Sequence, residues 1–278
     1  MAHPEVSPRS LVLDLLRAAA PTTIPIRVLV LAGAPFGLSD NAVRVATTRL
    51  LAAGKVESDE RGRYRLASDT DALTHHVERW RSGEAQRRPW SGQWLAVWMP
   101  KGTLRAERRR SLRALSLLGF REGLAGLWVR PDNLARSRDE LESDLQGLGL
   151  DAHAELFAAS SLSASLAQSF ATRLYDLRAL DASYDRTLRG LSASLNRVRD
   201  KPLERALVET FVKGGRAIRV LATDPWLPTE LLPADRRREL WETMITYDAV
   251  GRELWARALA ATPMEGAPAH LSAMARAS

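Results

Sequence analysis

The amino-acid sequence predicts a multidomain, α-rich α+β protein, and three observations support this class. The first 66 or so residues show helical periodicity, turn residues and then a short strand–turn–strand pattern, which is the order of a winged helix-turn-helix. From 89 to 160 the strand and helix patterns follow the order of a ferredoxin-like domain. After Ser160 the strand patterns stop, so the remainder is expected to be all-α.

The chain is expected to contain several domains, because 278 residues suffice for two or three separate hydrophobic cores. We divide it into a winged helix-turn-helix at 1–68, a linker helix at 69–88, a ferredoxin-like domain at 89–160 and a helical domain at 161–278. Hydrophobic residues make up 45% of the sequence and charged residues 26%, which is the balance of a globular protein.

Several classes of protein are excluded by what the sequence lacks. The longest apolar candidate, 26–34, falls well short of the roughly 18 residues of a membrane span. The first ten residues lack the basic-then-apolar order of a signal peptide, so we expect a cytoplasmic protein. There is no cysteine, which removes disulfides, thiolate nucleophiles and the common structural zinc sites.

The charge balance favours a polyanionic partner. The net charge is +7, and the excess of basic over acidic residues lies mainly in the first 150 residues. Arginine supplies 36 of the 40 basic residues. Arginine suits bidentate contact with phosphate or guanine better than lysine does, but a genome rich in G and C gives the same bias. Both explanations stay open at this point.

Three helices are expected before the predicted hairpin. In the first, at 10–20, Leu11, Leu15 and Leu16 share one face. The second runs from Pro25 to about Ala34, since proline fits the first turn of a helix. A turn follows in which Gly37 is available for an unusual backbone angle.

The third helix begins after Ser39, a natural N-cap, and Gly54 closes it. Val43, Ala46 and Leu50 fall on the side that would face a core. The opposite arc comprises Asn41, Arg44, Val45 and Thr48. This arc mixes hydrogen-bonding groups with one methyl surface, unlike the Glu and Lys mixture of an ordinary solvated face. The segments 55–58 and 63–66 then alternate as the strands of a β-hairpin.

This order of elements predicts a DNA-binding surface, because the second helix of a helix-turn-helix enters the major groove. Asn41 can pair with adenine, Arg44 with guanine, and Val45 can contact a thymine methyl group. Phosphate contacts are expected from Ser39, Thr47, Thr48 and Arg49. The hairpin is expected to contact an adjacent groove of the DNA, or its backbone, through Arg61, Arg63 and Arg65. The alternative is a winged helix that contacts only protein, with these arginines solvated.

The middle of the chain is expected to form a polar linker helix followed by alternating strands and helices. His75 and His76 are adjacent and point in different directions on a helix, so we expect no metal site there. The expected ferredoxin-like elements are a strand at 95–99, a helix around 104–118, the strand "GLAGLWVRP", the helix "SRDELESDLQGLG" and a strand at 151–159.

The last segment is expected to contain long helices. One helical segment runs through about Leu195, and a second is expected to be disturbed at Gly214 and Gly215. A proline-bounded connector, "DPWLPTELLP", precedes the last long helix. The residues from about 265 on are expected to be loose. The last long helix and the helix at 170–190 are our candidates for dimerisation.

The whole chain resembles the PaaX family of bacterial transcriptional repressors. The most specific matches are the W-x-G-x-W pattern that begins at Trp90, "LWVRPDNL" at 127–134 and "DPWLPTELLP" at 224–233. The resemblance implies a homodimeric repressor of a catabolic operon that binds double-stranded DNA and is released by a small-molecule effector, phenylacetyl-CoA or another acyl-CoA. It assigns no residues to that ligand, so the effector-binding residues stay unknown.

The resemblance also bears on catalysis. The middle domain is similar to a ferredoxin-like subunit of CRISPR adaptation complexes, some of which carry a metal-binding aspartate at the end of the first strand. Here that strand ends "VWMPKG", without a carboxylate, which argues against metal-dependent hydrolysis. No glycine-rich phosphate loop, G-x-S-x-G or H-E-x-x-H occurs. We therefore expect no enzyme, no cofactor and no metal, and keep a nuclease or a protein-binding scaffold as alternatives.

Two features leave the effector site open. Tryptophans gather in the middle and last domains and could hold a flat aromatic acyl group, although core packing explains them as well. The segment "RAERRRSLR" at 105–113 could hold the phosphates of coenzyme A, lie against DNA or form a solvated helix face, and the last interpretation is favoured.

Overall fold

The structure is a computed structural model that describes residues 6–19, 22–59, 61–68, 71–100, 104–160 and 162–260. In this part of the chain it is α-rich with two small antiparallel sheets, which confirms the mixed, mainly helical class. The chain forms two compact units, each built from separate segments. The first contains Met1–Thr74, Leu191–Gly215 and Thr246–Ser278, and the second contains His75–Gly190 and Arg216–Ile245. The division into four domains stays a prediction.

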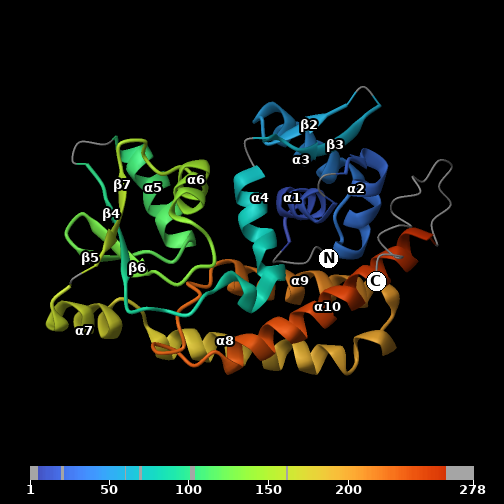
Figure 1. Ribbon diagram of the computed structural model, residues 1–278. Coiled ribbons are helices and arrows are strands. Elements are labelled where there is room, and N and C mark those ends of the chain that lie inside the picture. Colours follow the sequence, from blue (N-terminus) through green and yellow to red (C-terminus); the bar gives the residue numbers. More distant parts are fainter. Residues whose placement is uncertain are drawn as a thin grey trace. The chain divides into compact units, whose positions relative to one another are not determined.

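The first unit opens with the helices that the sequence predicts. They are α1 (Pro8–Ala19), α2 (Ile26–Gly33), the 3₁₀ turn η1 (Ala34–Phe36) and α3 (Asp40–Ala52) (Figure 1). Gly37 has a φ of 69°, which few residues other than glycine adopt readily, and it ends the turn. Ser39 then caps α3, because its hydroxyl accepts a hydrogen bond of 3.2 Å from the backbone N–H of Ala42.

A three-stranded sheet completes this part of the first unit. Its strands are β1 (Ile24–Pro25), β2 (Val56–Ser58) and β3 (Arg63–Leu66), in the antiparallel order β1-β3-β2. The hairpin of β2 and β3 was expected from its alternation. The strand β1 was not, because two residues carry no periodicity; it is recognisable only by its pairing with β3.

One hydrophobic core joins the three helices to the sheet. Val12, Leu29, Val43 and Leu50 are at most 2% exposed within it. A Cβ atom on Gly33 would lie 2.8 Å from Cγ2 of Val43, so the glycine lets α2 approach α3 closely. This packing fixes which face of α3 turns outward.

Segments from the C-terminal helices pack within the first unit. The helix α9 (Leu203–Ala222) places Phe211 edge-on against Phe36, with ring centroids 5.1 Å apart. The sequence predicts a disturbance of this helix at Gly214 and Gly215, which is wrong because α9 is continuous. The helical turns on both sides of the two glycines contain apolar residues, and one long helix buries those residues better than two short helices would.

The second unit contains a four-stranded antiparallel sheet in the order β5-β6-β4-β7. Its strands are β4 (Trp94–Trp98), β5 (Arg121–Leu124), β6 (Leu127–Pro131) and β7 (Glu155–Ala159). The segment "GLAGLWVRP", expected as one strand, instead belongs to two strands, β5 and β6, which pair with each other. The other strands and helices follow in the expected order. The helices between the strands are α5 (Arg105–Leu117) and α6 (Arg138–Gly147).

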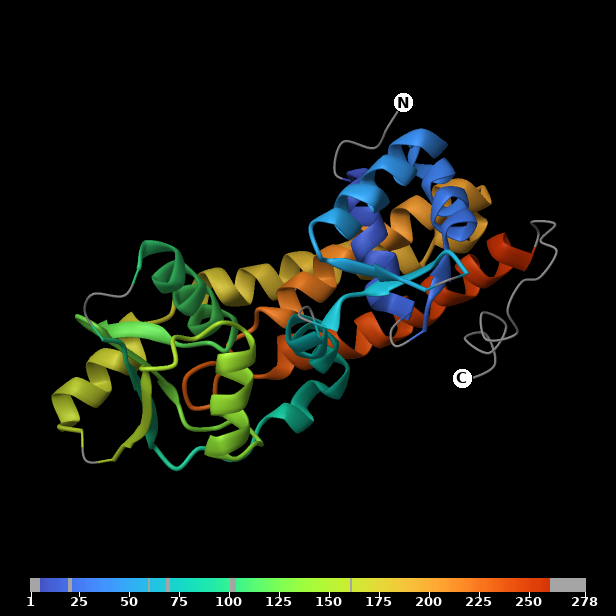
Figure 2. The same ribbon diagram turned by 90° about the horizontal axis from the view of Figure 1, so that it is seen from above.

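The two faces of this sheet have different cores. Leu95 and Val97 pack against α5 and α6, while Trp94 and Ala96 alternate with them and face the other side. There Phe170 of α7 (Ala164–Arg173) meets Trp94 with ring centroids 5.4 Å apart. The ribbons of Figure 1 and Figure 2 show α7 beside the sheet, on the side away from α5 and α6. Both faces of the sheet are therefore covered in part by helices.

The remaining helices differ from the sequence prediction in two places. The single helix expected up to Leu195 is divided into α7 and α8 (Leu177–Leu195). Between them Tyr175 turns inward and donates a hydrogen bond of 2.7 Å to the carbonyl of Gly119. The predicted linker helix is α4 (Asp71–Glu78) followed by the 3₁₀ segment η3 (Arg79–Gln86). The last helix, α10, covers Asp235–Ala260, and the segment expected to be loose lies outside the described residues.

No helix in the described part of the chain is long and apolar enough to cross a membrane.

Glu209 of α9 gives the first unit a pH-dependent contribution to stability. It accepts hydrogen bonds of 2.8 Å from Ser194 and Lys213 and pairs with Lys201. Burial acts to raise its pKa, but the partners outweigh this and hold the pKa at about 2, against an ordinary 4.5. Because the folded pKa is depressed, this stabilisation is present above pH 4.5 and is lost as the pH falls toward 2.

We therefore expect Glu209→Gln to lower the free energy of unfolding at neutral pH by more than it does near pH 2. Urea unfolding at a series of pH values measures this difference. Glu253→Gln is the control, since Glu253 forms an exposed ion pair with Arg199. A gap between wild type and Glu209→Gln that stays constant with pH would contradict the assignment.

Candidate nucleic-acid interface

The outward face of α3 carries the three residues that the sequence predicts for base contacts, together with Thr48, which it predicts for a phosphate contact. Asn41, Arg44 and Thr48 are exposed, and Val45 is 38% exposed. At positions i, i+3, i+4 and i+7 they form one continuous face of the helix. Val43 and Leu50, on the other side, are at most 2% exposed, so the core defines which groups face solvent.

Thr47 does not belong to this face, and its predicted phosphate contact is wrong. It is 1% exposed, and its hydroxyl donates a hydrogen bond of 2.9 Å to the carbonyl of Val43. Four residues after Val43, it lies on the buried side of α3. A short hydroxyl side chain can be accommodated in the core because its own helix backbone accepts its proton.

Of the other three residues expected at phosphates, Thr48 lies on the exposed face described above, and Ser39 and Arg49 are accessible as well. Ser39 is exposed, although its hydroxyl already accepts the N-cap hydrogen bond from Ala42. That oxygen can still donate its proton to an anion, since a hydroxyl is both donor and acceptor. Arg49 is exposed in the last turn of α3. Neither observation tests contact with DNA, so both roles stay predictions.

The three hairpin arginines occupy different environments. Arg63 donates to the hydroxyl oxygen of Thr23 at 2.7 Å and to its carbonyl at 2.8 Å. Arg65 pairs with Glu57 across the hairpin at 2.8 Å, in an exposed position. Arg61 lies exposed in the turn, where the carboxylate of Asp59 accepts its backbone N–H. Of the three, Arg61 has the guanidinium least committed to neighbours in the described part of the chain.

A basic hollow lies between the hairpin turn and the start of α2. Its volume is about 800 Å³, and its lining includes Arg27, Arg61 and Arg63 together with Asp59. The sequence did not identify Arg27 as a residue of this surface, because an arginine in the first turn of a helix has the same pattern whether or not it lines a hollow. Only the packing of β1 against β3 brings α2 and the hairpin together here.

The comparison with protein families concerns this same region. Residues 7–70 match a family model described as "PaaX-like protein". The chain is PaaX-like over these residues. The match contains α1, α2, α3 and the hairpin, and over residues 7–70 it confirms the resemblance found in the sequence. It covers the segment with the exposed face of α3 and the basic hollow.

Solved structures and curated proteins add two findings about the rest of the chain. The uncharacterized protein Rv0674 from Mycobacterium tuberculosis has a similar structure, with a TM-score of 0.61 and 27% sequence identity. The similarity covers 91% of this chain and 99% of that chain, so it extends well beyond the PaaX-like segment. No curated protein matches this chain.

Outside the PaaX-like segment, the histidines that the structure describes form no metal site. His76 is held by a hydrogen bond of 2.8 Å between its Nε2 and the carbonyl of Ala222, and burial lowers its pKa. His75, its neighbour, is exposed, and His153 lies beside Asp151 at 3.2 Å. His3 and His270 lie outside the described residues. Within the described ranges, no three His, Cys, Asp or Glu residues are grouped to hold a metal ion.

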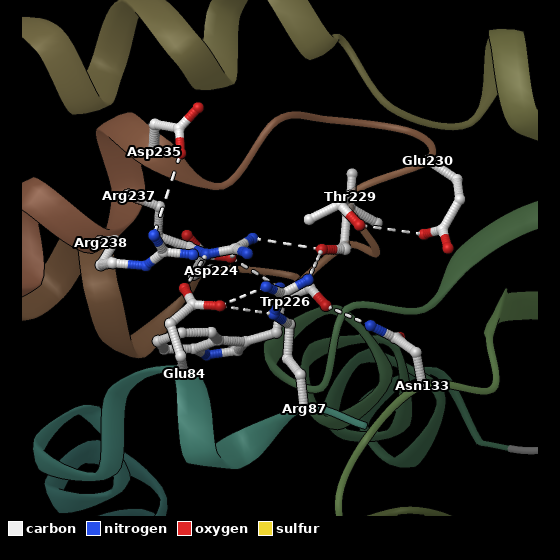
Figure 3. Close-up of polar contacts among 11 residues, drawn as sticks. Glu84, Arg87, Asn133, Asp224, Trp226, Thr229, Glu230, Asp235, Arg237 and Arg238 are labelled. Carbon is white, nitrogen blue, oxygen red and sulfur yellow. Dashed lines mark hydrogen bonds and ion pairs between the residues drawn. The ribbon is translucent and has the colours of Figure 1, made fainter. Parts of the chain in front are cut away.

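A buried polar cluster in the second unit joins η3 to α10 (Figure 3). Arg237, 1% exposed, donates to Glu84 at 3.0 Å and lies 3.8 Å from Asp224. The carboxylate of Asp224 also accepts the backbone N–H of Trp226 at 2.6 Å. Burial raises the pKa of Asp224, whereas Arg237 and Arg87 hold the pKa of Glu84 below its ordinary value against the effect of burial. These groups bind one another, which is the arrangement of a structural cluster.

The tryptophans are mostly packing residues. Trp80, Trp94 and Trp226 are at most 5% exposed and lie among apolar side chains or the polar cluster. Among the tryptophans of the four-stranded sheet, Trp98 differs from Trp94 because its side chain is 47% exposed. This burial favours the packing interpretation, and the effector site expected from the family resemblance stays a prediction.

Proposed function

We propose that the protein is a DNA-binding transcriptional regulator in which residues 1–68 act as a winged helix-turn-helix and α3 is the recognition helix. The observation that carries this proposal is the exposed face of α3, with Asn41, Arg44, Val45 and Thr48, in the segment that matches the PaaX-like family. The same positions on an ordinary surface helix would more often carry Glu and Lys.

The chemistry of this face fits the edges of base pairs in the major groove. The amide of Asn41 can pair with adenine, the guanidinium of Arg44 with guanine, and the methyl groups of Val45 with thymine. Ser39, Thr48 and Arg49 are exposed, and in this proposal they contact the DNA backbone on either side of the bases. Base contacts then provide sequence preference, and backbone contacts provide most of the affinity.

We further propose a homodimeric repressor of a catabolic operon. Two recognition helices would read the half-sites of an inverted repeat, one helical turn of about 34–36 Å apart or a multiple of it. The effector would be an acyl-CoA such as phenylacetyl-CoA. Release from DNA requires that the effector bind the DNA-free arrangement of the dimer more tightly than the DNA-bound one.

Arg44→Ala tests the assignment of α3. A preferred site is first selected from a random duplex pool with the wild-type chain. On that site we expect the variant to lose about 1–3 kcal/mol of binding free energy and to lose discrimination at one base pair. Fluorescence anisotropy on the site and on its single-base variants measures both quantities.

Arg17→Ala on α1 is the matched control, because it removes the same charge from a side chain that pairs with Asp14 at 2.7 Å. Unchanged affinity and discrimination in Arg44→Ala would reject Arg44 as a base-reading residue. A uniform loss on all sequences would assign it to a phosphate instead. A protein-binding scaffold predicts no salt-dependent duplex binding, and a nuclease predicts cleavage of labelled DNA or RNA with divalent metal above a metal-free control.

A further inference from the structure

The helix α5 carries a dense cluster of exposed arginines that the proposed function does not use. The α5 arginines are Arg105, Arg108, Arg109, Arg110 and Arg113. All five are exposed, and the helix contains one acidic residue, Glu107. The opposite side of α5 is buried, with Ala114 and Leu115 fully enclosed in the core of the second unit.

The spacing of these side chains forms a linear array. Arg105, Arg109 and Arg113 follow one another at four-residue intervals, so they lie on one stripe about 6 Å apart along the helix axis. Like charges at this spacing destabilise a helix by about 0.2–0.5 kcal/mol per pair. Alternating acidic residues would remove this cost. The stripe of arginines therefore concentrates positive charge on α5 although this lowers the stability of the helix.

Neighbouring acidic residues do not neutralise the array. Within the described ranges no ion pair joins an α5 arginine to a carboxylate. The adjacent α6 carries four acidic residues, and no described ion pair joins Asp139 or Glu142 to an α5 arginine. Asp144 pairs with Arg79 and Arg136, and the side chain of Glu140 accepts the backbone N–H of Ser137. The α5 arginines thus present their charge to solvent.

We propose that the α5 arginines bind the phosphate backbone of DNA, as a second contact surface apart from the recognition helix. This inference rests on the proposed function and adds a sequence-independent contact to it. An extended row of guanidinium groups matches an extended row of phosphates, and each neutralised phosphate releases condensed counterions. The stripe alone extends about 12 Å along the helix.

A coenzyme A ligand fits this surface less well. Compact phosphate groups are bound by donors that converge on one point. The α5 arginines instead diverge over about 200° around the helix axis, at about 100° per residue. A surface that diverges in this way suits a polymer that crosses the helix, and not a small molecule that is enclosed.

The test compares three full-length triple variants on a long duplex of random sequence. The first replaces Arg105, Arg109 and Arg113 by glutamine, and the second replaces the same residues by lysine. The matched control replaces Arg178, Arg186 and Arg189 of α8 by glutamine, which removes the same charge from another helix of the chain. Fluorescence anisotropy over salt concentrations from about 50 to about 200 mM gives the slope of log affinity against log salt.

We expect the α5 glutamine variant to reduce the magnitude of this slope by about 2–3, close to 0.9 for each phosphate that is no longer neutralised. The α8 control and the α5 lysine variant should keep a slope within about 1 of wild type. Equal slopes for the two glutamine variants would overturn the inference while leaving the proposed function intact. The inference would also be overturned if coenzyme A displaced the duplex from the wild-type chain when both are present at the same concentration of phosphate groups. A wild-type chain without salt-dependent duplex binding would reject the proposed function as well.

Discussion

Replacement of Arg237 by methionine is expected to destabilise the second unit by about 3–5 kcal/mol, because it leaves the buried carboxylate of Asp224 without a cationic partner and leaves Glu84 with Arg87 alone. The guanidinium of Arg237 is 1% exposed and donates to Glu84, while the side chain of Asp224 beside it is fully enclosed. Methionine has a similar length, so the cavity it creates is small. The cost therefore comes from the unpaired charge.

Neighbouring substitutions separate this effect from a general loss of charge. Arg236→Met removes a guanidinium that is 50% exposed and pairs with Asp185 at 2.9 Å, and exposed pairs contribute about 0–1 kcal/mol. A double variant that adds Asp224→Asn to Arg237→Met should recover part of the loss, since it removes the stranded carboxylate, whereas Glu84 keeps Arg87 as its partner. Urea unfolding followed by tryptophan fluorescence measures all three. Equal unfolding midpoints for Arg236→Met and Arg237→Met would contradict the structural role of the cluster.

The elements of the first unit could be predicted because local signals there agree with one another. The apolar spacing of α1, the proline before α2, Gly37 and the Ser39 cap indicate the elements that the structure has, with helix ends that differ from the expected ones by about one or two residues. The strand β1 escaped prediction because its two residues gain their conformation from pairing with β3. Local patterns reveal an element only when the element is long enough to repeat them.

The candidate site was predictable at the level of a helix face but not of each side chain. Periodicity separates Asn41 and Arg44 from Val43 correctly, yet it does not show that Thr47 is buried and satisfied by its own helix. Likewise, a sequence gives no sign that Arg63 is held by Thr23, which lies 40 residues earlier. Such pairings depend on tertiary packing, which brings distant segments together.

The helical segments show a related limit. Gly214 and Gly215 were expected to disturb α9, but a mean cost of about 1 kcal/mol for a glycine is small beside the burial of a long amphipathic helix. The break at Tyr175 has both a local and a long-range cause, and the sequence prediction used neither. The side chain of Asp176 accepts the backbone N–H of Ala179 as a cap of α8, and the hydroxyl of Tyr175 donates to the carbonyl of Gly119.

Gly83→Ala is expected to destabilise the second unit by about 4 kcal/mol, as the sum of backbone strain and overpacking. Gly83 has a φ of 51° within η3, and a Cβ atom there would lie 2.4 Å from Cε2 of Trp241. The indole ring belongs to α10, its nitrogen is buried, and Cδ2 and Cζ2 would also lie within 2.8 Å of the new atom, so the whole ring would have to shift. The clash would therefore separate η3 from α10.

Gly92→Ala measures the backbone strain without the clash. Gly92 has a φ of 83°, but no atom lies within 4 Å of the position that a new Cβ would take. Its expected cost is about 1 kcal/mol from the backbone alone. Adding Trp241→Leu to Gly83→Ala should then recover part of the lost stability, which no purely backbone effect would allow. Unfolding free energies that are equal for Gly83→Ala and Gly92→Ala would show that η3 does not need close contact with α10.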